Sequence, residues 1–139
     1  MATQYITFTI AGGLYGLEVR QVEETLGHLP RTPVPLAPQG VAGLVNLRGQ
    51  VVTAIDVRPR LGVAPLAPHQ ESMMVVVSHA GESMSLLVDE VGEVLTVDEA
   101  DFEPAPPTLS DDVRALVGGA YKLDGRLLLA FDVAVAVGA

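Results

Sequence analysis

The chain has 139 residues, 49% hydrophobic and only 4% aromatic, which predicts an aliphatic globular chain with a true core and not a disordered one. Its formal net charge of -9, with eight basic residues, disfavours nucleic acid and anionic membrane surfaces as partners, because both attract clustered lysine and arginine. The absence of cysteine excludes disulfides, cysteine-ligated metals and thiol catalysis, and it fits a reducing cytoplasm.

The first predicted element is a hairpin. Residues 5–10 alternate and are rich in β-branched and aromatic side chains, residues 11–13 form a glycine-rich turn, and residues 14–19 resume as a strand. In the next segment, residues 20–26, apolar side chains recur every three or four positions among polar ones. This spacing predicts one or two helical turns.

Prolines then dominate. Four of them lie within residues 28–39 and exclude a regular helix or a central strand, so we expect an edge strand or a connector. Residues 41–47, the turn at Arg48-Gly49 and the strand 51–57 follow. Because that strand is largely apolar on both faces, we expect it inside its sheet. Residues 58–70, again rich in proline, predict a loop at the boundary between two halves.

The second half begins as the first did. Residues 73–78 and 84–88 predict two strands joined by a turn at residues 79–82. Residues 89–95 contain a glycine and several valines, which favour a continued strand over a helix.

A long connector, residues 98–119, precedes the last strand. Within it Ser110 is positioned to cap a helical turn. Residues 126–133 predict the final strand, and residues 134–139 a last helical turn or a frayed end.

The chain repeats itself. The sequence of residues 47–57 is similar to that of residues 123–133. An earlier set, Leu17, Val19, Val22 and Glu24, matches a later set in the same order: Leu86, Val88, Val91 and Glu93. This duplication, with about eight to ten short strands and no sustained helical pattern, predicts an all-β chain of two small barrels packed side by side. A single sandwich is the alternative.

A search for catalytic or metal-binding chemistry finds none. The sequence has three histidines, His28, His69 and His79, and none of them has another histidine at the short spacing typical of a metal site. It also contains neither a nucleophile elbow nor a phosphate-binding glycine loop. We therefore expect no enzyme activity, no cofactor and no metal. Asp56 and Asp132 occupy the same place in the two repeats, where a carboxylate can accept backbone N–H bonds from the following turn.

Arg48 is the residue for which the sequence favours a functional role. It lies at a turn in an almost wholly apolar stretch, and the second copy has Asp124 in its place. Such an arginine needs a carboxylate, with Glu23 and Glu24 as candidates, or an acceptor on a binding partner. The alternative is a surface arginine that contributes nothing measurable.

These residues carry a family resemblance. The run from Gly43 to Val52 with Ile55-Asp56-Val57-Arg58 resembles the signature of the CheW family, adaptors of bacterial chemosensory arrays, and four further blocks, at residues 15–19, 22–24, 87–95 and 118–132, resemble it in order. The resemblance covers essentially the whole chain.

The resemblance implies two intertwined five-stranded SH3-like barrels with one or two short helices and no catalysis. It also implies a cytoplasmic scaffold that links the regulatory domain of a CheA-type histidine kinase to the cytoplasmic tips of methyl-accepting chemoreceptors, without nucleic acid and without membrane insertion. We expect one CheW-like domain over residues 1–139, with approximate halves 1–62 and 71–139 joined by the loop 58–70 and strand exchange as an option. The partner-binding residues that it implies are Val22, Glu24, Gly43, Asn46, Leu47, Arg48 and Gly49, with Glu24 and Arg48 paired.

Two competing hypotheses stay open at this point. One is a small-ligand-binding barrel or a hydrolase that uses acids such as Asp89, Glu90 and Glu93 in a closed pocket. The other is the regulatory part of a larger signalling protein, which the start at Met1 disfavours. A shallow apolar groove between the barrels would favour the adaptor instead.

Overall fold

The structure is a computed structural model that describes residues 1–38, 40–67 and 70–137. His69, one of the three isolated histidines, lies outside the described residues, as do Gln39 of the proline-rich connector and the last two residues of the chain.

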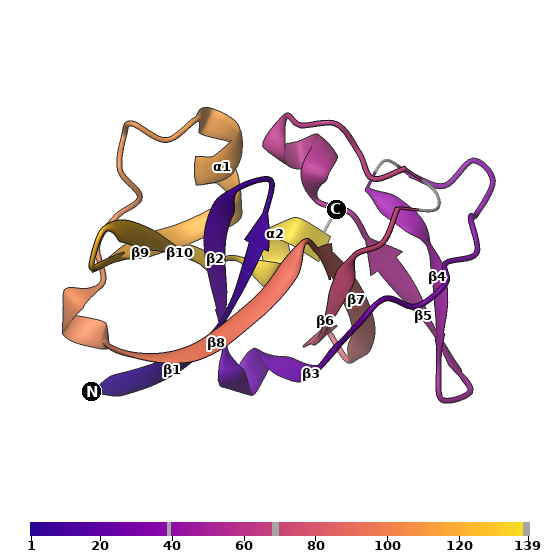
Figure 1. The fold of residues 1–139 in the computed structure, drawn as a ribbon, viewed down its shortest axis with the longest axis horizontal. Helices are drawn as coiled ribbons and strands as arrows, with labels where there is room; N and C mark the ends of the chain where they lie inside the picture. Colours follow the sequence, from indigo (N-terminus) through magenta and orange to yellow (C-terminus); the bar gives the residue numbers. More distant parts are fainter. Residues whose placement is uncertain (39, 68–69, 138–139) are drawn as a thin grey trace.

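Two five-stranded sheets lie side by side (Figure 1). Sheet A has the order β8-β1-β2-β10-β9, and its strands are β1 (Ala2–Ile10), β2 (Gly13–Glu18), β8 (Glu90–Asp98), β9 (Val117–Leu123) and β10 (Arg126–Phe131). Sheet B has the order β3-β6-β7-β5-β4, and its strands are β3 (Val22–Leu26), β4 (Val41–Leu47), β5 (Gln50–Ile55), β6 (Met73–His79) and β7 (Glu82–Val88). The predicted all-β class is confirmed.

Short helices lie between the strands and after the last strand. Among the described residues, three are single 3-10 turns and two are α-helices of five or six residues: η1 (Val19–Gln21), η2 (Arg58–Leu61), η3 (Glu99–Asp101), α1 (Asp111–Leu116) and α2 (Val133–Val137). The predicted cap at Ser110 is confirmed, because its Oγ accepts a hydrogen bond from Val113 N at 3.2 Å.

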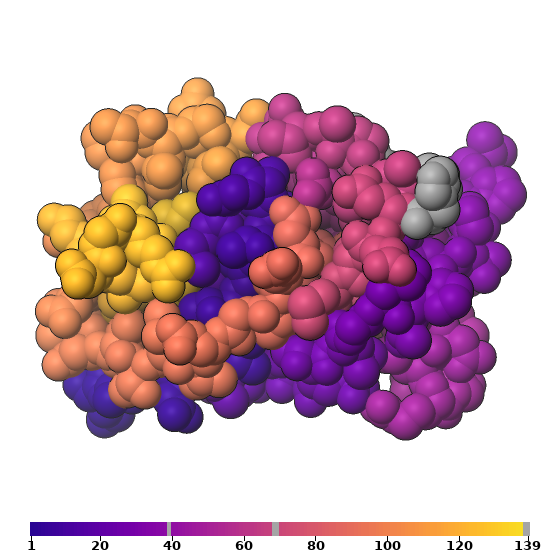
Figure 2. Space-filling model, viewed as in Figure 1, coloured from indigo at the N-terminus to yellow at the C-terminus, as the bar shows by residue number. Residues whose placement is uncertain are grey.

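Each sheet combines strands from both repeats. Strand β2 of the first copy pairs in parallel with β10 of the second, and β7 of the second copy pairs in parallel with β5 of the first. The N-terminal hairpin and the C-terminal strands therefore lie next to one another, as the adjoining indigo and yellow surfaces show (Figure 2). The division of the chain into halves 1–62 and 71–139 stays a prediction.

The part of the chain that the structure describes forms three apolar clusters. The largest draws side chains from both sheets, including Phe8 and Leu17 of sheet A and Val75 and Leu86 of sheet B. The other two each belong to one sheet: a cluster around Val45 in sheet B and one formed by Tyr5, Tyr121 and Leu128 in sheet A. The largest cluster therefore holds the two barrels together.

The helix predicted for residues 20–26 is wrong. Only η1 is helical, and Val22–Leu26 is strand β3, which pairs antiparallel with β6. The open edge of β6 offers this segment a ladder of backbone hydrogen bonds, and its β-branched Val22 and Thr25 fit a strand, so tertiary pairing overrides a short helical periodicity.

Most other predicted elements agree with the structure, but the predicted loop 58–70 begins with η2, and the predicted connector 98–119 includes the first residues of β9. Strand β5 is internal, between β7 and β4, and residues 89–95 continue as β8. The described part of the proline-rich connector contains no strand and makes only one isolated bridge, between Thr32 and Leu44.

Candidate protein-interaction surface

Arg48 occupies the tip of the β4–β5 hairpin. Leu47 pairs with Gln50, so the turn has two residues, and both have positive φ, 50° at Arg48 and 87° at Gly49. Such turns match the twist of the flanking strands, and glycine adopts the second position without strain. Asn46 Oδ1 accepts a hydrogen bond from Gly49 N at 2.9 Å. Asn46 and Gly49 thus fix the turn from which the Arg48 side chain projects, 71% exposed.

Arg48 forms the predicted ion pair with Glu24. Its Nη2 donates to Glu24 Oε1, and this bond raises the pKa of the guanidinium above its ordinary value. Glu24 belongs to β3 and Arg48 adjoins β4, which are the two outer strands of sheet B. The pair therefore joins opposite edges of the sheet, which must curl to bring them together. Because the arginine is exposed, the pair directs the side chain more than it stabilises the fold.

A hollow of about 210 Å³ lies beside this pair. It is lined by Glu23, Glu24, Leu47, Arg48, Gln50, Val52, Val76 and Ser83. Ser83 Oγ donates to Glu23 Oε1 at 2.7 Å, which fixes the other acid of β3. We call Glu24, Leu47 and Arg48, with the turn residues Asn46 and Gly49, the turn patch.

Gly43 and Val22 lie elsewhere and are fixed by packing. Gly43 has φ 144°, and a Cβ built there would lie 2.6 Å from the carbonyl oxygen of Thr32. Thr32 and Leu44 exchange two backbone hydrogen bonds of 2.8 Å, so Gly43 lets the proline-rich connector lie against β4. Val22 is half-buried and packs against the largest apolar cluster. The structure thus brings five of the seven expected residues together and leaves these two outside the turn patch.

The two repeated aspartates have the predicted structural role. Asp56 Oδ1 accepts from Arg58 N and its Oδ2 from Leu66 N, both at 2.9 Å, while Asp132 Oδ1 accepts from Val135 N at 3.2 Å. The prediction that both carboxylates hold the turn after a strand is confirmed.

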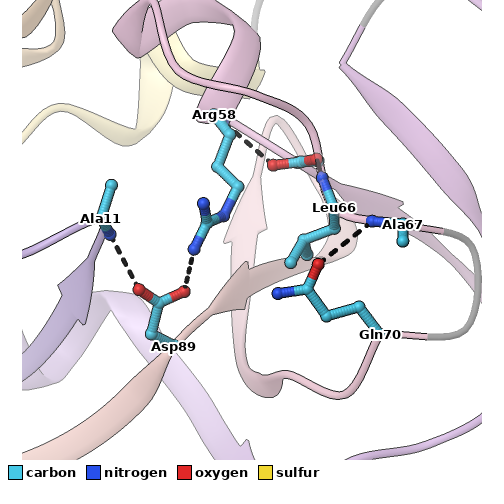
Figure 3. A network of polar contacts seen from close by, with 7 residues as sticks. Ala11, Arg58, Leu66, Ala67, Gln70 and Asp89 are labelled. Carbon is cyan, nitrogen blue, oxygen red and sulfur yellow. Dashed lines mark hydrogen bonds and ion pairs between the residues drawn. The ribbon is translucent and has the colours of Figure 1, made fainter.

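A polar network that the sequence did not predict lies at the junction of the sheets. Asp89 binds Arg58 and the backbone of Ala11, as Figure 3 shows. The available signal was a difference between the repeats, since Arg58 stands where the second copy has Ala134.

The described residues offer little to the competing enzyme hypothesis. No group of three or more histidines, cysteines and acids among them could hold a metal ion. Of the acids that this hypothesis named, Asp89 is engaged in the junction, while Glu90 and Glu93 are exposed beside a hollow of about 270 Å³. None of the helices in the described ranges is long and apolar enough to cross a membrane.

Comparison with known proteins gives consistent matches along the chain. The model of the CheW-like domain family matches residues 4–138. The chain is 33% identical over 125 residues to "Chemotaxis protein CheW" of Rhizobium meliloti (strain 1021), covering 90% of this chain and 81% of the relative. It is 30% identical over 127 residues to "Chemotaxis protein CheW" of Bacillus subtilis (strain 168), covering 91% and 81%. The crystal structure of the scaffolding protein TtCheW from Thermoanaerobacter tengcongensis matches with a TM-score of 0.82 and 31% identity, over 96% of this chain and 90% of that one.

Proposed function

This chain belongs to the CheW-like domain family, and we propose that it couples the regulatory domain of a CheA-type histidine kinase to the cytoplasmic tips of methyl-accepting chemoreceptors. As a member of that family it is a non-enzymatic adaptor of chemotaxis signalling. The proposal adds the two partners and the cytoplasm as the place where they meet.

The observation that carries the proposal is the geometry of the turn patch. Arg48 is exposed and yet held in one direction by the Glu24 carboxylate and by a rigid two-residue turn. An arginine that is ordered without being buried loses little entropy when it binds an acceptor on a partner. Leu47 at its base is only 9% exposed and forms the apolar floor of the hollow, and interfaces typically combine an apolar centre with a polar rim.

We propose that the turn patch is a docking site for one of the two partners. Glu24 and Arg48 make the contact, Leu47 forms the buried apolar floor beneath them, and Asn46 and Gly49 shape the turn. Gly43 and Val22 support binding indirectly, because they hold the connector and β3 in place.

Arg48→Ala and Arg48→Asp test the proposal. A pull-down with the kinase regulatory domain and with receptor-tip fragments should show lost binding of at least one partner, while the melting temperature stays near that of the unchanged chain. Arg20→Ala is the matched control, because Arg20 is also exposed and paired, with Glu18, but lies outside the turn patch. If Arg48→Asp binds both partners as well as the control does, the turn patch is not a docking site.

A further inference from the structure

The described chain passes between the two sheets at two places. The first crossing is η1, between β2 and β3, and the second is Asp89, which alone separates β7 from β8. The backbone N of Asp89 donates to Thr9 O of β1 at 2.8 Å. A single residue at a crossing is a natural pivot between two rigid bodies.

The carboxylate of Asp89 binds both bodies at once. Its Oδ2 accepts from the backbone N of Ala11, in the β1–β2 turn of sheet A, at 2.8 Å. Its Oδ1 accepts from Nη2 of Arg58, which follows β5 of sheet B, at 2.5 Å. Figure 3 shows the carboxylate between these two donors. The Arg58 side chain is only 17% exposed, so solvent screens this pair less than it screens the pair at Arg48.

Arg58 is itself positioned by a buried group. Asp56, which is 5% exposed, fixes the start of η2 by accepting from Arg58 N and from Leu66 N. Two residues further along η2, Arg60 Nη1 donates to the carbonyl oxygen of Val135 in α2, the helix that follows sheet A. The helix η2 therefore reaches from sheet B to sheet A with two arginines. We call Arg58, Arg60 and Asp89 the η2 clamp.

The repeats differ at this clamp. When Asp56 is matched to Asp132, Arg58 corresponds to Ala134 and Arg60 to Ala136, which is buried against the largest apolar cluster. Thus one copy supplies the arginines and the other a small apolar surface. Burial in that cluster favours contact between the sheets but is not directional, whereas charged hydrogen bonds fix an angle.

We propose that Arg58, Arg60 and Asp89 are positioning residues that set the angle between the two barrels. The consequence for signalling rests on the proposed function. The angle between the barrels fixes how a partner docked on one barrel is placed relative to a partner docked on the other. Receptor control of the kinase then depends on the clamp even though the clamp touches neither partner.

Pulsed electron paramagnetic resonance detects a change in this angle as a change in a distance across the junction. The chain has no cysteine, so spin labels at Thr96→Cys on β8 and Ser78→Cys on β6, both exposed, report one distance across the junction. In Asp89→Asn and in Arg58→Gln the mean distance should shift by about 2 Å or more, or its distribution should broaden, by a similar amount in each. Arg58→Lys, which keeps the charge, should restore most of the original distribution.

Lys122→Gln is the control, because it removes an exposed ion pair with Glu103 on the sheet A side alone. An unchanged distribution in both Asp89→Asn and Arg58→Gln overturns the proposal. Should Asp89→Asn fail to fold, Arg60→Gln, which leaves Asp89 intact, provides the same measurement.

A pull-down and a kinase assay separate this inference from the proposed function. Clamp variants should bind each partner alone and lose receptor control of the kinase, and retained control would refute the signalling part. If the unchanged chain binds neither partner, the proposed function fails, while the distance measurement still decides the role of the clamp.

Discussion

Gly43→Ala is the substitution for which the structure gives the sharpest expectation. A side chain at φ 144° is strained, and its Cβ would meet the Thr32 carbonyl oxygen at 2.6 Å. Since that oxygen belongs to backbone that bonds Leu44 in both directions, it cannot move without breaking the Thr32–Leu44 bridge.

The expected loss of stability has two parts. The strained φ costs about 2 kcal/mol, and two weakened backbone hydrogen bonds cost about 1 kcal/mol each. The sum of about 4 kcal/mol is a large share of the stability of an ordinary domain. The connector should also leave β4, so partner binding would be lost together with the fold of this region.

Urea unfolding followed by circular dichroism measures this loss. Gly49→Ala is the matched control, because Gly49 also has positive φ but nothing lies within 4 Å of a built Cβ, so it should lose only about 1 kcal/mol. Gly118→Ala, without positive φ and in open space, should be close to neutral. If Gly43→Ala loses no more stability than Gly49→Ala, the close approach of Thr32 is not what requires glycine.

Three further substitutions have distinct expected outcomes. Asp56→Ala removes a buried acceptor of two backbone N–H groups and should lower the free energy of unfolding in urea by about 3 kcal/mol. Asp132→Ala removes one longer hydrogen bond and should lower it clearly less, and equal losses would show that the two bonds of Asp56 are not what stabilises the fold. Ser110→Ala should lose about 1 kcal/mol and expose the amide of Val113 to faster hydrogen exchange, and an unchanged exchange rate would exclude the cap. Burial, with a bond to Tyr121, raises the pKa of the Tyr5 hydroxyl, so the fold favours the neutral phenol. The stabilisation from the neutral Tyr5 hydroxyl is complete below the unfolded pKa of about 10 and is lost as pH rises toward the higher folded pKa. Between about pH 9 and 11, Tyr5→Phe should therefore lose less stability than the unchanged chain in unfolding experiments. Identical slopes of the free energy of unfolding against pH would refute this.

The exposed pair at Arg48 and the half-buried pair at Arg58 show why ion pairs differ in use. Both join segments that are distant in the sequence, but one projects from a turn and the other lies at the junction of two barrels. The first arginine is paired but mostly exposed to solvent, whereas the second is paired and largely shielded within the molecule. In our two proposals this difference in exposure, and not the residue type, separates the docking group from the positioning group.

The amino-acid sequence by itself determined the local structure and the repeat. Alternation, proline and glycine placed most strands and turns, and the matched Asp56 and Asp132 indicated caps, because these features depend on neighbours within a few residues. The turn from Asn46 to Gly49 followed from the same local chemistry, whereas the pairing of Arg48 with Glu24, 24 residues away, came from the family resemblance.

Only the tertiary structure decided how the copies combine. Residues 22–26 became a strand because β6 presented an open edge, and Gly43 is required because Thr32 approaches from a separate segment. The exchange of strands between copies and the Asp89–Arg58 pair depend on which groups the packed core brings within hydrogen-bond distance. Local propensity does not predict these contacts, because they form only when burial of apolar side chains brings distant segments of the chain together.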